Sequence, residues 1–127
     1  MSKFASKIAN KQVNKNELSR MNQVRIDLLK KYIAEDPADP FNSYGLACEY
    51  LEELPEEALV LFQKLLKDHS DYLPTYYQAG QLLEAFEKEE EALKVYEDGM
   101  ALAKAQNNTK TFQELRSVHQ NLLFEMD

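Results

Sequence analysis

The chain has 127 residues, a hydrophobic fraction of 44% and a formal net charge of −7, values that suit a single domain with a buried core. Its one cysteine, Cys48, excludes an intrachain disulfide, and no apolar run approaches the ~20 residues that a membrane-spanning helix needs. Apolar residues follow helical spacing throughout, without strand-like alternation or a hairpin dipeptide. The sequence therefore predicts an all-α fold.

Charge is distributed unevenly along the chain. Residues 1–31 carry eight Lys or Arg and two acids, a net of +6, whereas residues 32–127 carry seven Lys or Arg and 20 acids, a net of −13. We expect this acidic body to repel nucleic acid and to attract neutral or basic partners.

Residues 1–20 are basic and polar, with a lysine at every fourth position from Lys3 to Lys15. An arm that binds a membrane surface or nucleic acid is one interpretation. The two apolar residues, Phe4 and Ile8, are too few to anchor it, so we expect a flexible terminus and no membrane partner. The absence of an apolar core of about seven residues, as in a signal peptide, favours a cytoplasmic protein.

A leading helix is predicted at residues 21–36. It ends at Asp36 because the residue before a proline, here Pro37, is driven out of the α region. Its expected apolar side consists of Val24, Leu28, Leu29, Tyr32 and Ile33.

Residues 39–70 form the first predicted pair of helices. Asp39 and Pro40 supply the N-cap and the first helical position of one helix. Pro55, followed by two acids, opens the other helix. The expected buried face of this second helix consists of Ala58, Leu59, Phe62, Leu65 and Leu66.

Residues 71–106 form a second pair, joined by the charged tract 87–91. Gly80 in a helix interior costs roughly 1 kcal/mol relative to alanine. We therefore expect Gly80 and Ala92 to lie where two helices cross closely, so that added bulk would cost ~1–3 kcal/mol. The apolar stripes of the two helices are Tyr76, Ala79, Gly80 and Leu83, and Leu93, Tyr96, Met100 and Ala103.

A capping helix is predicted at residues 108–126, after the break at Asn107. One polar face suits a terminal helix, which covers the core on one side only. Its expected apolar stripe consists of Phe112, Leu115, Val118, Leu122 and Met126.

The two pairs repeat each other at a fixed spacing. Ala58-x-x-x-Phe62 lies 34 residues before Ala92-x-x-x-Tyr96. The preceding helices match at a spacing of 33, which leaves the register of the first one open by one residue. That match pairs Leu46, Ala47 and Tyr50 with Ala79, Gly80 and Leu83.

This pattern resembles the tetratricopeptide repeat, a 34-residue helix–turn–helix unit with small and aromatic residues at these positions. The sequence departs from that pattern in having no Trp, Ser43 at the aromatic position, and Ser70 and Lys104 at the closing proline positions. The resemblance covers about residues 22–126. It implies a right-handed α-α superhelix of about five to six antiparallel helices, in which residues 21–36 match the second helix of an incomplete repeat.

The resemblance also implies that the first helix of each repeat lines a concave groove that binds a peptide or helix of a partner protein. An alternative for Tyr44 and Tyr77 is that they only pack between repeats. The expected groove residues are Tyr44, Cys48, Leu51, Glu52, Tyr77, Gln81 and Glu84, with Thr111 from the last helix.

Some members of the family grip the carboxylate of a chaperone tail with Lys, Asn and Arg side chains. The matching positions here are Tyr44, Cys48, Gln78, Asn108 and Phe112. Only Asn108 fits, so we do not expect a clamp of this kind, and the acidic surface favours a neutral or basic partner.

No catalytic, cofactor or metal site is expected. His69 and His119 lack a second ligand at a useful spacing, and Cys48 lacks a neighbouring base that would activate its thiol. The three scattered glycines cannot form a phosphate-binding loop. Two functions remain: an adaptor whose groove binds a protein segment, or a module that forms homodimers through an open end of the solenoid.

Overall fold

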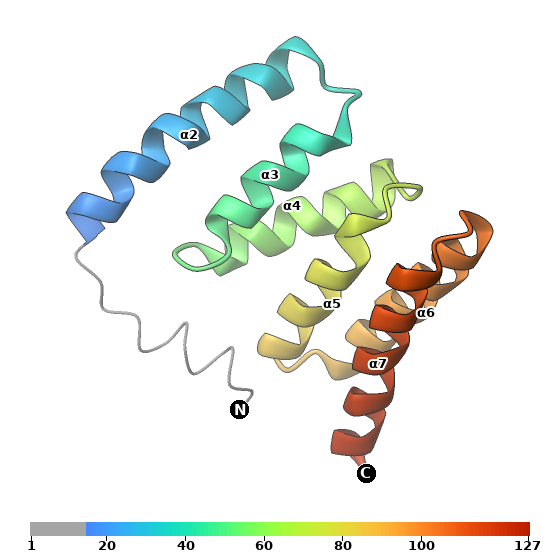
Figure 1. Ribbon diagram of the computed structural model, residues 1–127. Coiled ribbons are helices and arrows are strands. Elements are labelled where there is room, and N and C mark those ends of the chain that lie inside the picture. The colour runs from blue at the N-terminus through green and yellow to red at the C-terminus, as the bar shows by residue number, and fades with distance from the viewer. Residues whose placement is uncertain (1–14) are drawn as a thin grey trace.

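A computed structural model of the chain describes the backbone of residues 15–127 and the side chains from residue 23 onward. The described part contains six α-helices and no strand, which confirms the all-α prediction (Figure 1). The helices are α2 (Lys15–Glu35), α3 (Pro40–Tyr50), α4 (Pro55–Asp68), α5 (Pro74–Ala85), α6 (Glu89–Ala105) and α7 (Thr109–Met126).

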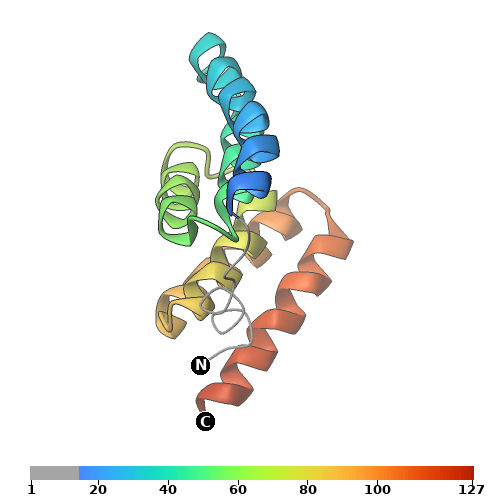
Figure 2. The same ribbon diagram turned by 90° about the vertical axis from the view of Figure 1, so that its left-hand side faces the viewer.

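Each helix packs against the next helix along the chain, so the molecule is a solenoid of successive hairpins. In Figure 1, α3, α5 and α7 lie in front of α4 and α6. Figure 2, turned by 90°, places α4 and α7 on opposite sides of the molecule. The first helices of the hairpins therefore share one face of the array.

Helix ends follow from local chemistry. Pro40, Pro55 and Pro74 each occupy the first position of a helix, where a missing N–H costs nothing. The Asp39 side chain accepts a hydrogen bond from the Phe41 N–H at 3.0 Å and caps α3. The helix starts at Pro40 and Pro55 are those that the sequence predicts.

α5 and α6 end in the same type of turn. Glu87 and Asn107 have φ of 61° and 57°, the left-handed conformation that closes a helix. The following N–H groups, of Lys88 and Asn108, donate to the carbonyl oxygens five residues earlier, at Leu83 and Ala103. Because α6 begins at Glu89, most of the charged tract 87–91 belongs to its first turn.

The core runs along the whole solenoid, and its tightest contact is between α5 and α6. A Cβ added at Gly80 would lie 2.1 Å from Cε1 of Tyr96, and Ala92 is fully buried. The predicted close crossing is confirmed. Gly99 has the same role toward α5 and α7, because its Cβ would lie 2.7 Å from that of Tyr76.

The leading helix differs from its prediction. It begins at Lys15, not at residue 21. Of the segment 1–20 that we predicted to be flexible, residues 1–14 lie outside the described residues and residues 15–20 belong to α2. Three members of the predicted apolar side, Val24, Leu28 and Tyr32, are 64%, 44% and 44% exposed. The predicted side was thus partly wrong because α3 is the main helix, among those that the structure describes, that packs against α2. The residues of α2 that pack on the core are Ile26, Leu29 and Ile33.

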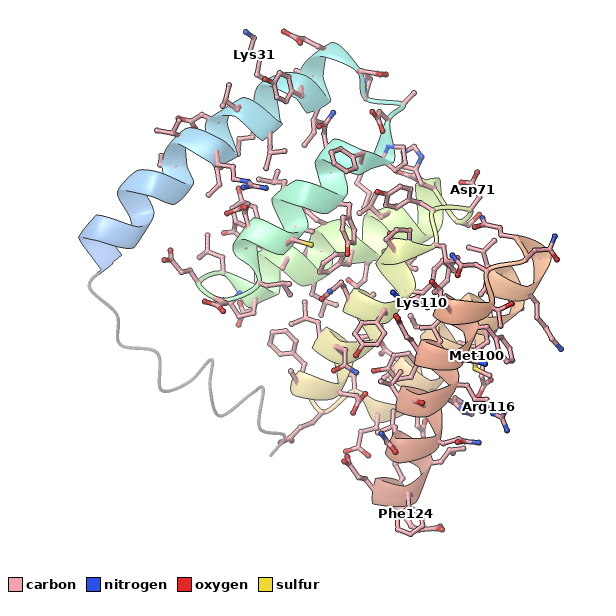
Figure 3. The ribbon with its side chains drawn as sticks, viewed as in Figure 1. Lys31, Asp71, Met100, Lys110, Arg116 and Phe124 are labelled. Atoms are coloured by element: carbon pink, nitrogen blue, oxygen red, sulfur yellow. The ribbon has the colours of Figure 1, made fainter. Side chains whose placement is uncertain are left out.

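The opposite end of the solenoid is also partly uncovered. Leu115 and Leu122 of α7 are buried as predicted, but Met126 is 39% exposed. Phe124, in the last turn, is 86% exposed and points away from the body of the molecule in Figure 3. The last turn of α7 therefore exposes apolar side chains on its outer side.

Candidate binding groove

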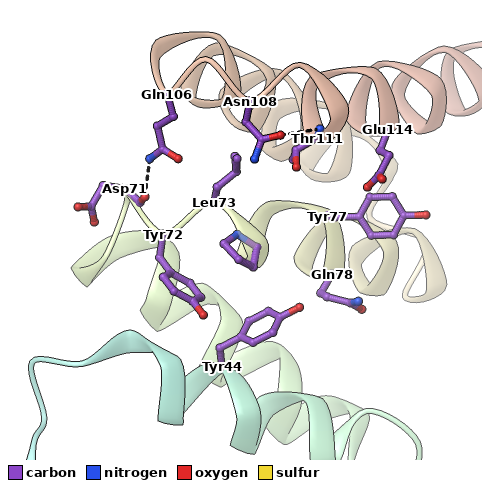
Figure 4. A pocket seen from close by; sticks show the side chains of 11 residues that line it. Tyr44, Asp71, Tyr72, Leu73, Tyr77, Gln78, Gln106, Asn108, Thr111 and Glu114 are labelled. Atoms are coloured by element: carbon purple, nitrogen blue, oxygen red, sulfur yellow. Dashed lines mark hydrogen bonds between the residues drawn. The ribbon is translucent and has the colours of Figure 1, made fainter.

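A hollow of about 680 Å³ opens on the face formed by α3, α5 and α7 (Figure 4). Its walls come from these three helices, from the link between α4 and α5, and from the turn between α6 and α7. The lining residues are Tyr44, Asp71, Tyr72, Leu73, Pro74, Tyr77, Gln78, Gln106, Asn108, Thr111 and Glu114.

Aromatic packing holds one wall in place. The Tyr44 ring contacts the buried ring of Phe62 edge-on, with centroids 6.0 Å apart. Its other neighbour is Tyr72 of the α4–α5 link, with centroids 5.7 Å apart. Such pairs add to the stabilisation from burial alone, so Tyr44 connects the core to the surface of the hollow.

Hydrogen bonds hold the opposite wall. The Gln106 side chain donates to the Asp71 carbonyl oxygen at 2.8 Å and ties the α6–α7 turn to the α4–α5 link. The Asn108 side chain accepts from the Thr111 N–H at 3.0 Å and caps α7. Two connecting segments distant in the sequence are thereby fixed beside each other.

The hollow is aromatic and acidic. Three tyrosines and two acidic residues, Asp71 and Glu114, line it, and none of its lining residues is Lys, Arg or His. Burial raises the pKa of Tyr44 well above its ordinary range, with the neighbouring Cys48 contributing to the shift. Burial also raises the pKa of Tyr72, so both phenols are neutral at physiological pH and keep their hydroxyl protons.

The structure brings three of the predicted groove residues together. Tyr44, Tyr77 and Thr111 line the hollow. Cys48 lies beside the Tyr44 phenol but does not line the hollow. Burial raises the pKa of its thiol. Leu51, which packs against the core, and the exposed Glu52 also lie outside the lining.

Gln81 and Glu84 face the second helix of their own repeat instead of the hollow. The fully buried ring of Tyr96 carries its hydroxyl to the Glu84 carboxylate, to which it donates a hydrogen bond. Gln81 donates to the same hydroxyl at 2.7 Å. Because a buried phenol needs hydrogen-bond partners, these two polar residues bind it, and the geometry gives them a structural role.

Other lining residues were not among the predicted groove residues. Tyr72 and Asp71 lie in the α4–α5 link, and Gln106 lies in the α6–α7 turn. Helical phase predicts only residues on the first helices, so it could not find them. The available signal was a tyrosine two residues before a helix-opening proline, as in Tyr72-Leu73-Pro74.

Within the described residues, no group of three or more His, Cys, Asp or Glu is placed to hold a metal ion. None of the described helices is both long and apolar enough to cross a membrane. The arrangement offers aromatic faces, amides and carboxylates, which are groups that bind other molecules.

Comparison with known proteins agrees with this architecture. No family model and no curated protein matches the chain. The solution structure of a tetratricopeptide repeat domain protein from Salinibacter ruber is 34% identical, covers 68% of this chain and 89% of that chain, and has a TM-score of 0.65. A crystal structure of the tetratricopeptide repeat domain protein from Salinibacter ruber is 33% identical, with coverages of 66% and 96% and a TM-score of 0.64.

The fold is thus an α-solenoid of helical hairpins, in which the first helices share one face. The chain belongs to the tetratricopeptide repeat family. Such solenoids form extended concave binding surfaces, and the family's fold generally serves as a protein-interaction scaffold.

Proposed function

We propose that this protein is a non-catalytic interaction module that binds an extended segment of a partner protein in the groove between α3, α5 and α7. One observation carries the proposal: three tyrosines from separate elements converge on a hollow of about 680 Å³ on that face. Tyrosine offers a large apolar body and a hydroxyl at small entropic cost, so it is common at recognition surfaces.

The elements around the hollow are held firmly. Hydrogen bonds and ring contacts fix the α4–α5 link from both sides, and α5 lies between α4 and α6. A surface that is already ordered loses little conformational entropy on binding. The groove is therefore suited to bind a flexible segment whose ordering is the main entropic cost.

Affinity capture from a cell lysate tests the proposal. We expect the full chain to retain a partner that a Tyr77→Ala/Gln78→Ala variant loses, because both side chains line the hollow from α5. The matched control is Val60→Ala/Gln63→Ala, which changes exposed residues of α4. Thermal unfolding must show that the groove variant is folded. Equal retention by all three proteins would refute groove binding.

A second candidate function is self-association through the open end at α2. It rests on Val24, Leu28 and Tyr32, which lie four residues apart on one side of α2 and are 64%, 44% and 44% exposed. Light scattering over a concentration series would detect a dimer, and Leu28→Lys should dissociate it. A strict monomer at high concentration would dismiss this candidate.

A further inference from the structure

The hollow has a charge that groove binding in general does not require. Asp71 and Glu114 both line it, and neither forms an ion pair with another described residue. Lys110, one position before Thr111 on α7, is not part of the lining. In Figure 4 the Glu114 carboxylate extends from α7 toward the Tyr77 ring, whereas the Asp71 carboxylate points away from the hollow. Glu114 is therefore the carboxylate that the hollow presents without an ion-pair partner among the described residues.

We propose that the hollow receives a positively charged side chain, arginine or lysine, from the segment that binds in the groove. The inference rests on the proposed function and names the chemistry of the partner. The occupant is a segment of another protein with at least one basic residue, and its complement is the acidic, tyrosine-lined wall described above.

The groups present match a cation, and arginine in particular. A cation placed over a tyrosine ring is attracted by the negative face of the ring. Tyr77 of α5 and Glu114 of α7 line the hollow from two different helices, and in Figure 4 the Glu114 side chain extends toward the Tyr77 ring. A guanidinium group is planar and stacks on aromatic rings while donating up to five hydrogen bonds. Carboxylate and amide oxygens at the rim can accept these bonds.

An anion is a poorer match, although α5 and α7 both begin at the hollow. The N–H groups that would bind an anion at the start of α5 are absent or occupied. Pro74 has none, and those of Thr75 and Tyr76 donate to the carbonyls of Tyr72 and Leu73. At the start of α7, the Thr111 N–H is bonded to the Asn108 side chain. The Glu114 carboxylate, which lines the hollow, would repel an anion further.

The charge of the whole body acts in the same direction. Residues 32–127 carry a net charge of −13, so a basic segment is attracted before it contacts the groove. This long-range term is screened within about 10 Å at 0.1 M salt, whereas a cation inside the hollow is screened less. Binding should therefore weaken with added salt without disappearing.

The test is an NMR titration of the full chain with two peptides, both blocked at their ends. One is Gly-Ser-Ala-Arg-Ala-Ser-Gly, and the other has citrulline, the uncharged isostere, in place of arginine. We expect the arginine peptide to shift resonances of Tyr77 and Thr111 and to bind about tenfold more tightly than the citrulline peptide. Glu114→Gln should remove most of that difference. Glu125→Gln, which removes the same charge from α7 outside the hollow, should leave it unchanged.

Equal binding of both peptides, no binding of either, or shifts outside the groove would overturn the proposal. The chain's own basic residues are a competing occupant, which a full-length Lys3→Gln/Lys7→Gln/Lys11→Gln variant tests. If the arginine peptide binds this lysine variant but does not bind the parent protein, the chain's own basic segment occupies the hollow, and the assignment to a partner is overturned. If affinity capture still depends on Tyr77 and Gln78 when the peptides fail, groove binding stands and only the charge preference is wrong.

Discussion

Gly80 shows how one residue fixes the distance between two helices. The ring of Tyr96 fills the space that a side chain at position 80 would need, and the Tyr96 hydroxyl is itself bonded to Glu84 and Gln81. The ring is therefore held at both ends and cannot move aside easily. The small residue and the large one are two parts of a single packing unit.

Substituting Gly80 by alanine should lower the free energy of unfolding by about 1–3 kcal/mol, because the new Cβ would lie 2.1 Å from Cε1 of Tyr96. Gly45→Ala is the matched control. Its Cβ would meet only the end of the Leu29 side chain, at 3.3 Å, and alanine gains about 1 kcal/mol of helix propensity. Urea denaturation compares the two variants; equal stability would contradict the proposed crossing of α5 and α6.

Glu84 makes stability depend on pH. Burial raises its pKa above the ordinary value of 4.5, so the folded state holds the proton more tightly than the unfolded state does. The contribution of Glu84 is therefore largest below pH 4.5 and is lost as the pH rises through the folded pKa. In a Glu84→Gln variant the amide oxygen can still accept the hydrogen bond from the Tyr96 hydroxyl. The stability of this variant relative to the parent protein should therefore increase as the pH rises from about 4 to about 7.

Thermal unfolding across that pH range measures this difference. Glu53→Gln, at an exposed turn position, controls for the loss of one negative charge. A Glu84→Gln variant whose melting temperature follows the parent protein in parallel at every pH would show that the carboxyl has the same pKa in the folded and unfolded states.

At the scale of elements, the internal hairpins were the most predictable part of the molecule. α4, α5 and α6 each have neighbours on two sides, so their apolar stripes follow directly from sequence spacing, as Ala58 and Phe62 show. Among the described helices α2 has one main neighbour, α3, and its apolar residues exceed what α3 can cover. Helical phase alone could not decide which of them are buried, because Ile26 and Val24 are equally apolar.

The observed phase of α2 predicts opposite results for two neighbouring residues. Ile26 is 9% exposed and packs on the core, so Ile26→Ala should cost about 2 kcal/mol. Val24 is 64% exposed, so Val24→Ala should change stability by less than about 0.5 kcal/mol. Denaturant unfolding of both variants decides the matter. A larger loss of stability from Val24→Ala than from Ile26→Ala would contradict the observed phase and support the apolar side of α2 that the sequence predicted.

At the scale of the whole molecule, the sequence predicted some of the residues that line the hollow and missed others. Tyr44 and Tyr77 were predictable from the positions they share in successive repeats. Tyr72, Asp71 and Gln106 were not, because they lie in connections whose course depends on tertiary hydrogen bonds. Helical phase also did not predict that Gln81 and Glu84 are hydrogen-bonded to the buried Tyr96 hydroxyl.

The central claim is that partner segments bind at the hollow between α3, α5 and α7. Site-directed photo-crosslinking tests it most directly, with p-benzoylphenylalanine in place of Tyr77 and, in a second protein, in place of the exposed Val60 of α4. Irradiation in a cell lysate should give discrete adducts from position 77 and none of these from position 60. The same adducts from both positions, or adducts from position 60 alone, would contradict the claim.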